Sequence, residues 1–192
     1  SNLSISESEQ KIIDEISKNF SELSHNCADD INAAAQSLIH SIQSGGKVMF
    51  CGNGGSAADS QHLAAELIGR YRKDRKALPG LALTTDTSNI TAVSNDYSYK
   101  EIFSRQIEGL GKENDILYAI STSGRSENII AAIKTAKKLN IKTIGITGSD
   151  GGDMTNICDI LIKVPASMPD RIQEMHIAIG QIICDIVEET LC

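Results

Sequence analysis

A chain of 192 residues is long enough for one domain with a substantial core, and its 41% apolar and 22% charged residues are typical of soluble globular proteins. The net charge of −7, without an extended basic patch, argues against a general nucleic-acid or acidic-membrane surface. No apolar run approaches the roughly 18 residues of a membrane helix and no signal-peptide pattern is present, so we expect a cytoplasmic protein.

Residues 1–44 contain neither Pro nor Gly, and apolar residues recur in steps of three and four over 12–42. This periodicity predicts helix over more than one average helix length. Residues 24–30 (SHNCADD) offer a second helix start, and Gly45-Gly46 ends the second helix. We predict two helices in 1–44 that pack on residues 45–192 and on partner subunits, all within one structural domain.

The chain continues with a short apolar run, Val48–Cys51, that predicts a buried strand. It leads into Gly52-Asn53-Gly54-Gly55-Ser56, where missing β-carbons permit positive φ and let the backbone approach a ligand closely. We expect Ser56 to cap the following helix, with Asp59 three residues on, close to the spacing of a capping box. Such a turn points free N–H groups and a positive helix end at its ligand, which suits a phosphate. Neither a GxGxxG nor a GxxxxGK[ST] motif is present.

His62 and Glu66 lie four residues apart on this predicted helix, so they share one face, and Arg70 follows one step later. An imidazole and a carboxylate on adjacent turns form half of a Zn²⁺ site or a proton-transfer pair beside a substrate. Taken alone, such a pair is more often a solvated helix pair. Within one strand–turn–helix unit, next to a phosphate-type turn, it favours a functional site.

Two other groups of residues are interpreted as structural. The basic residues after this helix are assigned to a solvated loop rather than to a phosphate site: Arg70, Arg72, Lys73, Arg75 and Lys76. The five cysteines are odd in number and lack CxxC spacing, so we expect buried free thiols: Cys27, Cys51, Cys158, Cys184 and Cys192.

Four further apolar runs predict strands at residues 81–85, 115–121, 142–147 and 159–164. Helical stretches separate most of them, notably 127–139 between the third and fourth strands of the chain. This alternation predicts an α/β fold with a parallel sheet covered by helices on both faces. In such sheets, ligands bind at the carboxyl ends of the strands, near the point where the strand order reverses.

Two of these strand ends carry hydroxyl-rich loops, Ser121-Thr122-Ser123-Gly124-Arg125-Ser126 and Thr147-Gly148-Ser149-Asp150-Gly151-Gly152. A loop of this kind supplies O–H and N–H donors to a phosphate without a Lys, although Ser and Thr also cap helices. Two such loops at one sheet edge favour a sugar phosphate over a nucleotide. The last predicted helix, about 170–191, is apolar on one side, so core packing is its default role.

Four motifs together carry a resemblance: the Gly-Asn-Gly-Gly-Ser turn, Gln61-His62 with Ala65-Glu66, the Ser121–Gly124 loop, and Arg171–His176 (RIQEMH). Over nearly its whole length the chain resembles the phosphoheptose isomerases of the sugar isomerase (SIS) domain family. The resemblance implies a three-layer αβα fold, with a doubly wound five-stranded parallel sheet and an N-terminal helical arm. It also implies a homotetramer with active sites at subunit interfaces.

The activity implied by this resemblance is the ketose-to-aldose isomerisation of sedoheptulose 7-phosphate to D-glycero-D-manno-heptose 7-phosphate. Its product would feed the synthesis of ADP- or GDP-heptose for lipopolysaccharide or other surface glycans. The phosphate would be held by Ser121, Thr122, Ser123 and Ser126. The sugar would be lined by Asn53, Gly54 and Gly55, by Asn95-Asp96 in the loop after the second strand, and by Glu66, Arg70, Asp170 and Gln173. One Zn²⁺ per active site would be expected at His62, Glu66, Gln173 and position 181.

The resemblance places a His at the position of Gln181. Isomerisation needs a base that removes a proton beside the carbonyl and an acid that reprotonates the enediol, and the resemblance gives these catalytic roles to Glu66 and that His. A Gln amide can ligate a metal or bond the substrate, but it cannot carry the proton. His176 lies roughly 140° around the helix from Gln181. The chain is therefore an engineered inactive variant, a natural member with altered activity, or one that uses another acid, and we expect binding to survive while turnover is impaired.

Gln173 and Gln181 are ~12 Å apart along one straight helix, whereas metal–ligand bonds are only ~2 Å long. Either two subunits share the metal site, or one of the two residues does not ligate the metal.

The alternative function is a non-catalytic SIS-domain tetramer that binds the bacterial replication initiator or senses sugar phosphates. Gln181 favours this alternative, whereas the His62–Glu66 pair counts against it. An arabinose 5-phosphate or glucosamine 6-phosphate type of isomerase is a weaker resemblance. We expect neither a nucleic-acid nor a membrane partner.

Overall fold

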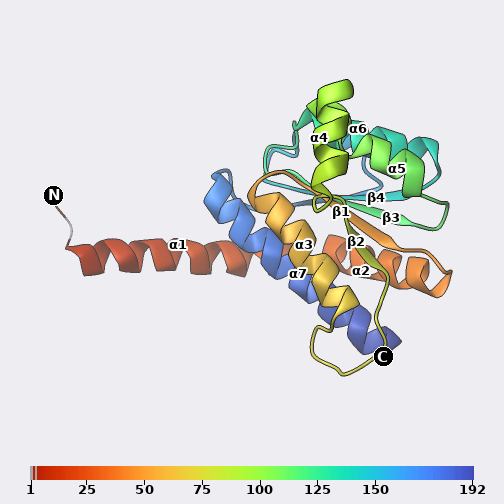
Figure 1. Ribbon diagram of the computed structural model, residues 1–192. Coiled ribbons are helices and arrows are strands. Elements are labelled where there is room, and N and C mark those ends of the chain that lie inside the picture. Colours follow the sequence, from red (N-terminus) through yellow and green to blue (C-terminus); the bar gives the residue numbers. More distant parts are fainter. Residues whose placement is uncertain (1, 3) are drawn as a thin grey trace.

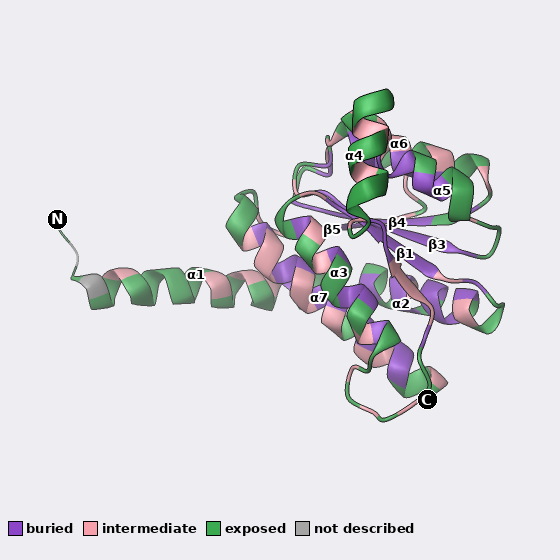
Figure 2. Ribbon diagram, viewed as in Figure 1, coloured by how far each residue is buried: buried purple, intermediate pink, exposed green. Residues whose placement is uncertain are grey.

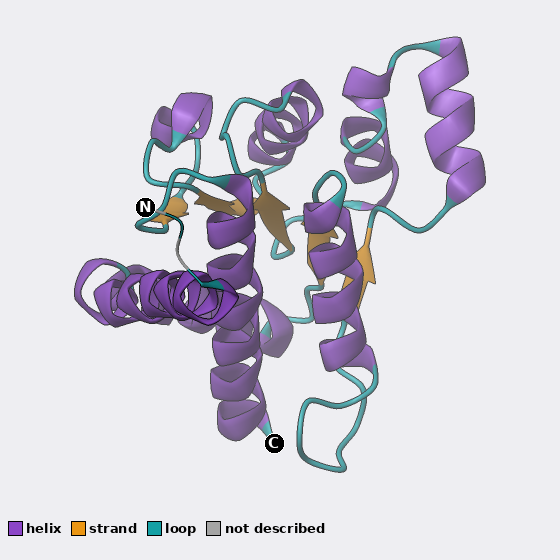
Figure 3. Cartoon of the chain, turned by 90° about the vertical axis from the view of Figure 1, so that its left-hand side faces the viewer, coloured by secondary structure: helices purple, strands orange, loops and turns teal. Residues whose placement is uncertain are grey.

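The computed structural model describes residue 2 and residues 4–192. Its centre is a parallel five-stranded sheet in the order β2-β1-β3-β4-β5, which confirms the predicted α/β class. Helices cover both faces of this sheet, so the fold has three layers (Figures 1 and 3). The strands are β1 (Val48–Cys51), β2 (Gly80–Ala82), β3 (Ile116–Ile120), β4 (Lys142–Thr147) and β5 (Ile160–Lys163).

Alternate side chains of the strands enter two separate cores, because successive residues of a strand point to opposite faces. Val48 and Phe50 of β1 join the core on one face, and Met49 and Cys51 join the core on the other. All four residues of β1 are buried, as expected for a strand covered on both sides. The first core is completed by the C-terminal end of α1 and by α2, α3 and α7, and the second by α5 and α6.

The two predicted N-terminal helices are α1 (Ile5–Asn26) and α2 (Ala28–Gln43), and they meet at Cys27. A capping box starts α1, because the Ser4 hydroxyl accepts from the Glu7 amide and the Glu7 carboxylate accepts from the Ser4 amide. Helix α2 packs beneath the sheet against α7, whereas most of α1 projects away from the body of the molecule (Figure 1).

The segment between β2 and β3 differs most from the sequence-based expectation. It holds α4 (Thr87–Asp96), the short 3₁₀ helix η1 (Tyr99–Glu101) and α5 (Ser104–Leu110). The prediction of a loop at Asn95-Asp96 was wrong, since both residues lie in the last turn of α4. Helix α4 has no fully buried residue among those described (Figure 2), so it carries only a weak hydrophobic pattern. Its start is set instead by Asp86, whose carboxylate accepts from the Asn89 amide (3.0 Å).

The remaining helices follow the predicted positions. They are α3 (Gly55–Ile68), α6 (Glu127–Lys138) and α7 (Pro169–Leu191), and a 3₁₀ helix, η2 (Gly152–Asn156), precedes β5. All five cysteines are free thiols, but only three of them are buried. The expectation of buried thiols was wrong for Cys158, which is partly buried, and for Cys192, which is exposed. Among the helices of the described residues, none combines the length and apolar character needed to cross a membrane.

Candidate active site

The strand order reverses at β1, and this reversal brings the predicted loops together. β1 pairs with β2 on one side and with β3 on the other, and Cys51 stands opposite Ala119 at the carboxyl end of the β1–β3 pair. The turn after β1 and the loop after β3 therefore leave the sheet side by side. This is the position at which open α/β sheets bind their ligands.

The turn after β1 ends at Gly54, whose backbone angles (φ 55°, ψ −120°) are accessible to glycine but strained for other residues. Gly54 is the N-cap of α3, so the prediction that Ser56 caps this helix was wrong. Ser56 lies buried inside the first turn, where its amide donates to the Asn53 carbonyl (2.9 Å). Among the described residues, the Gly54 and Gly55 amides have no acceptor, so both N–H groups remain available to an anion at a positive helix end.

The loop after β3 is organised by its own hydroxyls. The Ser121 and Ser126 hydroxyls are 3.1 Å apart, and the Gly124 amide donates to the Ser121 hydroxyl (3.1 Å). Ser126 is the N-cap of α6, but its side chain makes no capping bond. The hydroxyls of Ser121 and Ser126 therefore make hydrogen bonds within the loop and do not cap α6.

A cavity of about 250 Å³ opens between this loop and the ends of β4 and β5. Four of its lining residues carry hydroxyls, namely Thr122, Ser123, Ser149 and Ser167. An ion pair between Arg125 and Asp150 (2.9 Å) also lines it. The hydrogen bond and the charge of Arg125 lower the pKa of Asp150, so the pair stays ionised at neutral pH.

Asn53 connects the turn after β1 to α6 and to η1 through a polar network that the sequence analysis did not identify. Its carboxamide exchanges two hydrogen bonds with the carboxamide of Asn128 (2.8 and 2.9 Å) and accepts a third from the Tyr99 hydroxyl (2.7 Å). Asn128 is 3% exposed and sits in the first turn of α6, whereas Tyr99 comes from η1. The sequence offers one weak signal for this network, an Asn in the first turn of the predicted helix 127–139.

The His62–Glu66 pair lies farther along α3, toward its C-terminal end. The His62 Nε2 and Glu66 Oε1 atoms are 3.9 Å apart, and the side chains are 48% and 20% exposed. Seven residues separate Gly55 from His62, which amounts to about 10 Å along the helix. The pair therefore lies about two helical turns along α3 from the glycine turn. No three His, Cys, Asp or Glu side chains of the described residues cluster closely enough to hold a metal.

Helices α3 and α7 run side by side in the same direction, which places the two glutamines at different levels (Figure 1). A β-carbon on Gly55 would lie 2.9 Å from the Gln173 amide nitrogen, so Gln173 covers the start of α3. A β-carbon on Gly180 would lie 2.6 Å from a Leu63 methyl, so Gln181 comes level with the middle of α3. Asp170 is exposed in the first turn of α7, and Arg70 is exposed just after α3.

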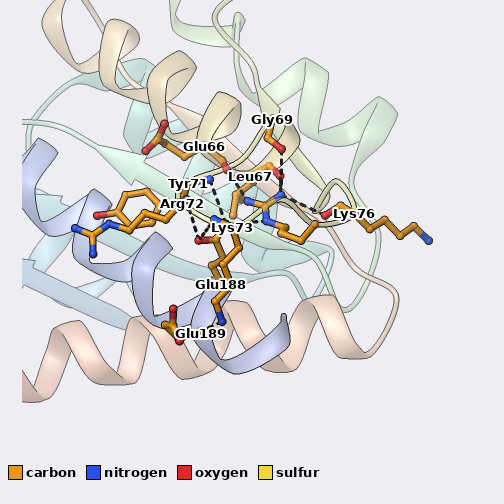
Figure 4. Close-up of polar contacts among 10 residues, drawn as sticks. Glu66, Leu67, Gly69, Tyr71, Arg72, Lys73, Lys76, Glu188 and Glu189 are labelled. Carbon is orange, nitrogen blue, oxygen red and sulfur yellow. Dashed lines mark hydrogen bonds and ion pairs between the residues drawn. The ribbon is translucent and has the colours of Figure 1, made fainter.

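A buried ion pair holds the loop after α3 in place. The prediction that Arg75 belongs to a solvated loop was therefore wrong. The Arg75 Nε and Glu188 Oε1 atoms are 2.9 Å apart, and the side chains are 6% and 1% exposed. Glu188 also accepts from the backbone amides of three loop residues, Tyr71, Arg72 and Lys73 (Figure 4). Arg75 in turn donates to carbonyls at the end of α3, including that of Glu66 (2.8 Å). We call this network the Glu188–Arg75 clamp.

His176 is a buried structural residue. Its Nε2 atom lies 2.9 Å from the carbonyl oxygen of Thr147, and its other ring nitrogen is buried without a partner among the described residues. Burial lowers the pKa of His176 to about 4, although the bond to Thr147 favours the protonated form. The ring is therefore neutral at pH 7, with its proton on Nε2.

This lowered pKa predicts a loss of stability in mild acid. The ordinary pKa of His is about 6.5, so between pH 6.5 and 4 the unfolded chain binds a proton that the folded chain does not, and stability falls as the pH falls. From this group we expect an unfolding free energy about 2 kcal/mol lower at pH 5 than at pH 7. Urea unfolding of His176→Leu at both pH values should lack this difference, while His40→Leu, an exposed control, should keep it. An unchanged pH dependence in His176→Leu would contradict the assignment.

The comparisons with known proteins agree on one family. The SIS domain profile matches residues 12–148. A phosphoheptose isomerase of Rhodospirillum rubrum is 54% identical over 166 residues, 86% of this chain and 88% of that protein. One of Clostridium acetobutylicum is 55% identical over 163 residues, covering 85% and 83%. Solved structures of the enzymes from Neisseria gonorrhoeae and Francisella tularensis superimpose with TM-scores of 0.91 and 0.93, at 38% and 36% identity, over 97% of this chain and all of theirs.

Proposed function

This chain belongs to the SIS domain family, and we propose that it is a phosphoheptose isomerase that converts sedoheptulose 7-phosphate into D-glycero-D-manno-heptose 7-phosphate. The observation that carries the proposal is the meeting of a glycine turn and a hydroxyl-rich loop at the strand-order reversal. It occurs in a chain that matches phosphoheptose isomerases over most of its length. We place the reaction in the cytoplasm, on the route to heptose for lipopolysaccharide or other surface glycans.

Phosphate binding is assigned to the loop after β3. Ser121, Thr122, Ser123 and Ser126 supply hydroxyls, and the two free amides of the turn after β1 lie at the neighbouring strand end. These donors are neutral, and the positive end of α3 supplies the electrostatic attraction. Asn53, Gly54 and Gly55 line the sugar, and Arg70, Asn95, Asp96, Asp170 and Gln173 complete the pocket.

Glu66 is proposed as the base that removes the proton next to the carbonyl. A carboxylate can remove a proton from carbon only if it reaches the substrate. Glu66 is partly exposed on α3, so its carboxylate is accessible to a ligand. The return of a proton requires an acid, which Gln181 cannot be, because its amide does not titrate. We therefore propose a site that binds its substrate and turns it over slowly.

The donor set of α3 fits a Zn²⁺ ion in part. Two ligands of a tetrahedral Zn²⁺ with bonds of about 2.1 Å lie about 3.4 Å apart, and the observed 3.9 Å between His62 Nε2 and Glu66 Oε1 needs only a small side-chain rotation. Gln173 and Gln181 are proposed as further ligands through their amide oxygens. A Zn²⁺ ion bound there would polarise the carbonyl of the substrate.

A homotetramer that shares its active sites is supported by two observations. Gln173 and Gln181 lie at different levels of α3, so one protomer does not place both beside the His62–Glu66 pair. The projecting α1 also exposes Ile12, Ile13 and Phe20, and an apolar groove of about 380 Å³ lies between α1, α2 and α7. We expect light scattering to give about four times the chain mass of 20.6 kDa; a monomer would exclude shared sites.

Product analysis tests the function directly. The chain is incubated with sedoheptulose 7-phosphate and Zn²⁺, and the sugar phosphates are identified by NMR. We expect slow formation of the aldose 7-phosphate, lost after chelation and in Glu66→Gln. Binding without any conversion would favour the non-catalytic alternative, and conversion of arabinose 5-phosphate instead would favour another isomerase.

A further inference from the structure

We propose that Tyr99 and Asn128 are positioning residues for the Asn53 carboxamide. They occupy both of its acceptor positions and one of its N–H groups, and the remaining N–H donates to the carbonyl oxygen of the substrate. The inference rests on the proposed isomerase function, which it deepens. It follows from the hydrogen bonds that Asn53 already makes.

A carboxamide has two acceptor positions on its oxygen and two N–H donors. The Asn53 oxygen accepts from the Tyr99 hydroxyl (2.7 Å) and from the Asn128 amide nitrogen (2.9 Å), so both of its acceptor positions are filled. One N–H of Asn53 donates to the Asn128 oxygen (2.8 Å). A single N–H has no partner among the described residues, and Asn53 therefore offers a ligand a donor and no acceptor.

The Asn53 oxygen, rather than its nitrogen, faces the Tyr99 hydroxyl, which donates to it at 2.7 Å. This length is typical of an O–H···O hydrogen bond. Asn128 is held in turn by its burial in the first turn of α6.

A fixed donor suits one part of the substrate more than the others. Sugar hydroxyls both donate and accept, whereas a carbonyl oxygen only accepts, and it gains negative charge as the neighbouring carbon loses its proton. Pre-oriented N–H groups stabilise such an oxygen more in the transition state than in the ground state. The backbone amides of the next two residues, Gly54 and Gly55, also lack an acceptor among the described residues.

Tyr99→Phe tests the role of the hydroxyl with little risk to folding, because Tyr99 is 58% exposed. Tyr97→Phe is the matched control, since Tyr97 is 57% exposed, lies two residues away and packs its ring under Arg105. The probes are two seven-carbon sugar phosphates, a hydroxamate that mimics the charged enediolate and an alditol that lacks the carbonyl. Affinities are measured by calorimetry, and thermal unfolding confirms that each variant is folded.

We expect Tyr99→Phe to weaken binding of the hydroxamate by about 5- to 10-fold, the effect of one ordinary hydrogen bond, and that of the alditol less than 2-fold. Asn128→Asp removes a donor at constant size, and it should also weaken binding of the hydroxamate more than binding of the alditol. Tyr97→Phe should leave the ratio of the two affinities unchanged. Equal affinities in Tyr99→Phe and the unsubstituted chain, or equally weakened binding of both probes, would overturn this inference but not the proposed function. Failure of the unsubstituted chain to bind either probe would overturn the proposed function as well.

Discussion

Replacing Gln181 with His is expected to raise the isomerase turnover of this chain by ~10²–10⁴-fold, the usual contribution of a general acid or base. The present side chain cannot exchange a proton near neutral pH, whereas an imidazole with a pKa near 6.5 can. Position 181 is partly exposed and comes level with the middle of α3, which carries His62 and Glu66. The rest of the site is unchanged by this substitution, so the gain should appear in kcat more than in KM.

Initial rates of sedoheptulose 7-phosphate conversion measure this gain, and Gln36→His is a suitable control. Gln36 is exposed on α2, so a His placed there adds an imidazole away from the site. The gain in Gln181→His should also bring a pH profile with a limb near the pKa of His. No increase in kcat would show that another group supplies the proton, and the account of Gln181 as the impairing residue would then fail.

Removal of one partner of the Glu188–Arg75 clamp is expected to have the largest effect on stability. Truncating one member of a buried ion pair leaves the other charge uncompensated and costs about 3–5 kcal/mol. The side chain of Glu188 is 1% exposed and accepts from three backbone amides as well as from Arg75 (Figure 4). Urea unfolding should therefore show both Glu188→Ala and Arg75→Ala strongly destabilised.

Glu189→Ala is the matched control, because Glu189 is the adjacent residue and its ion pair with Lys73 (3.1 Å) is exposed. Exposed pairs contribute about 0–1 kcal/mol. Burial by itself raises the pKa of Glu188, but the amides of Arg72, Lys73 and Tyr71 and the Arg75 side chain outweigh it and lower the pKa below its ordinary value. The clamp should thus be intact at neutral pH and be lost only in acid, as Glu188 is protonated. Equal costs for Glu188→Ala and Glu189→Ala would contradict the importance of the clamp.

The sequence was sufficient to predict the strands and helices that carry a strong hydrophobic pattern. Strands β1 and β4 begin and end where they were predicted, and α7 begins within one residue of its expected start. These segments are long or deeply buried, so periodicity decides them. Helix α4 was missed because it has no fully buried residue among those described and depends on the local cap of Asp86. Ser56 was mistaken for a cap because Gly54 takes that position through its backbone angles, which a list of residue types does not reveal.

For the site, the sequence was sufficient to predict the two loops that meet at the sheet edge, because parallel strands place their carboxyl ends together. It did not identify Tyr99, Asn128 or Glu188, whose roles depend on contacts across 46, 75 and up to 117 residues of sequence. Arg75 looked like one basic loop residue among several, and only its burial against Glu188 distinguishes it.

A crystal structure of the chain with bound sedoheptulose 7-phosphate is the most direct test of the account. We predict that phosphate oxygens lie within about 3.2 Å of the hydroxyls of the Ser121–Ser126 loop. The carbonyl end of the sugar should then lie beside Asn53 and beside a His62–Glu66 pair of the assembly. A phosphate bound away from this loop, or a sugar remote from the His62–Glu66 pair of every subunit, would contradict it.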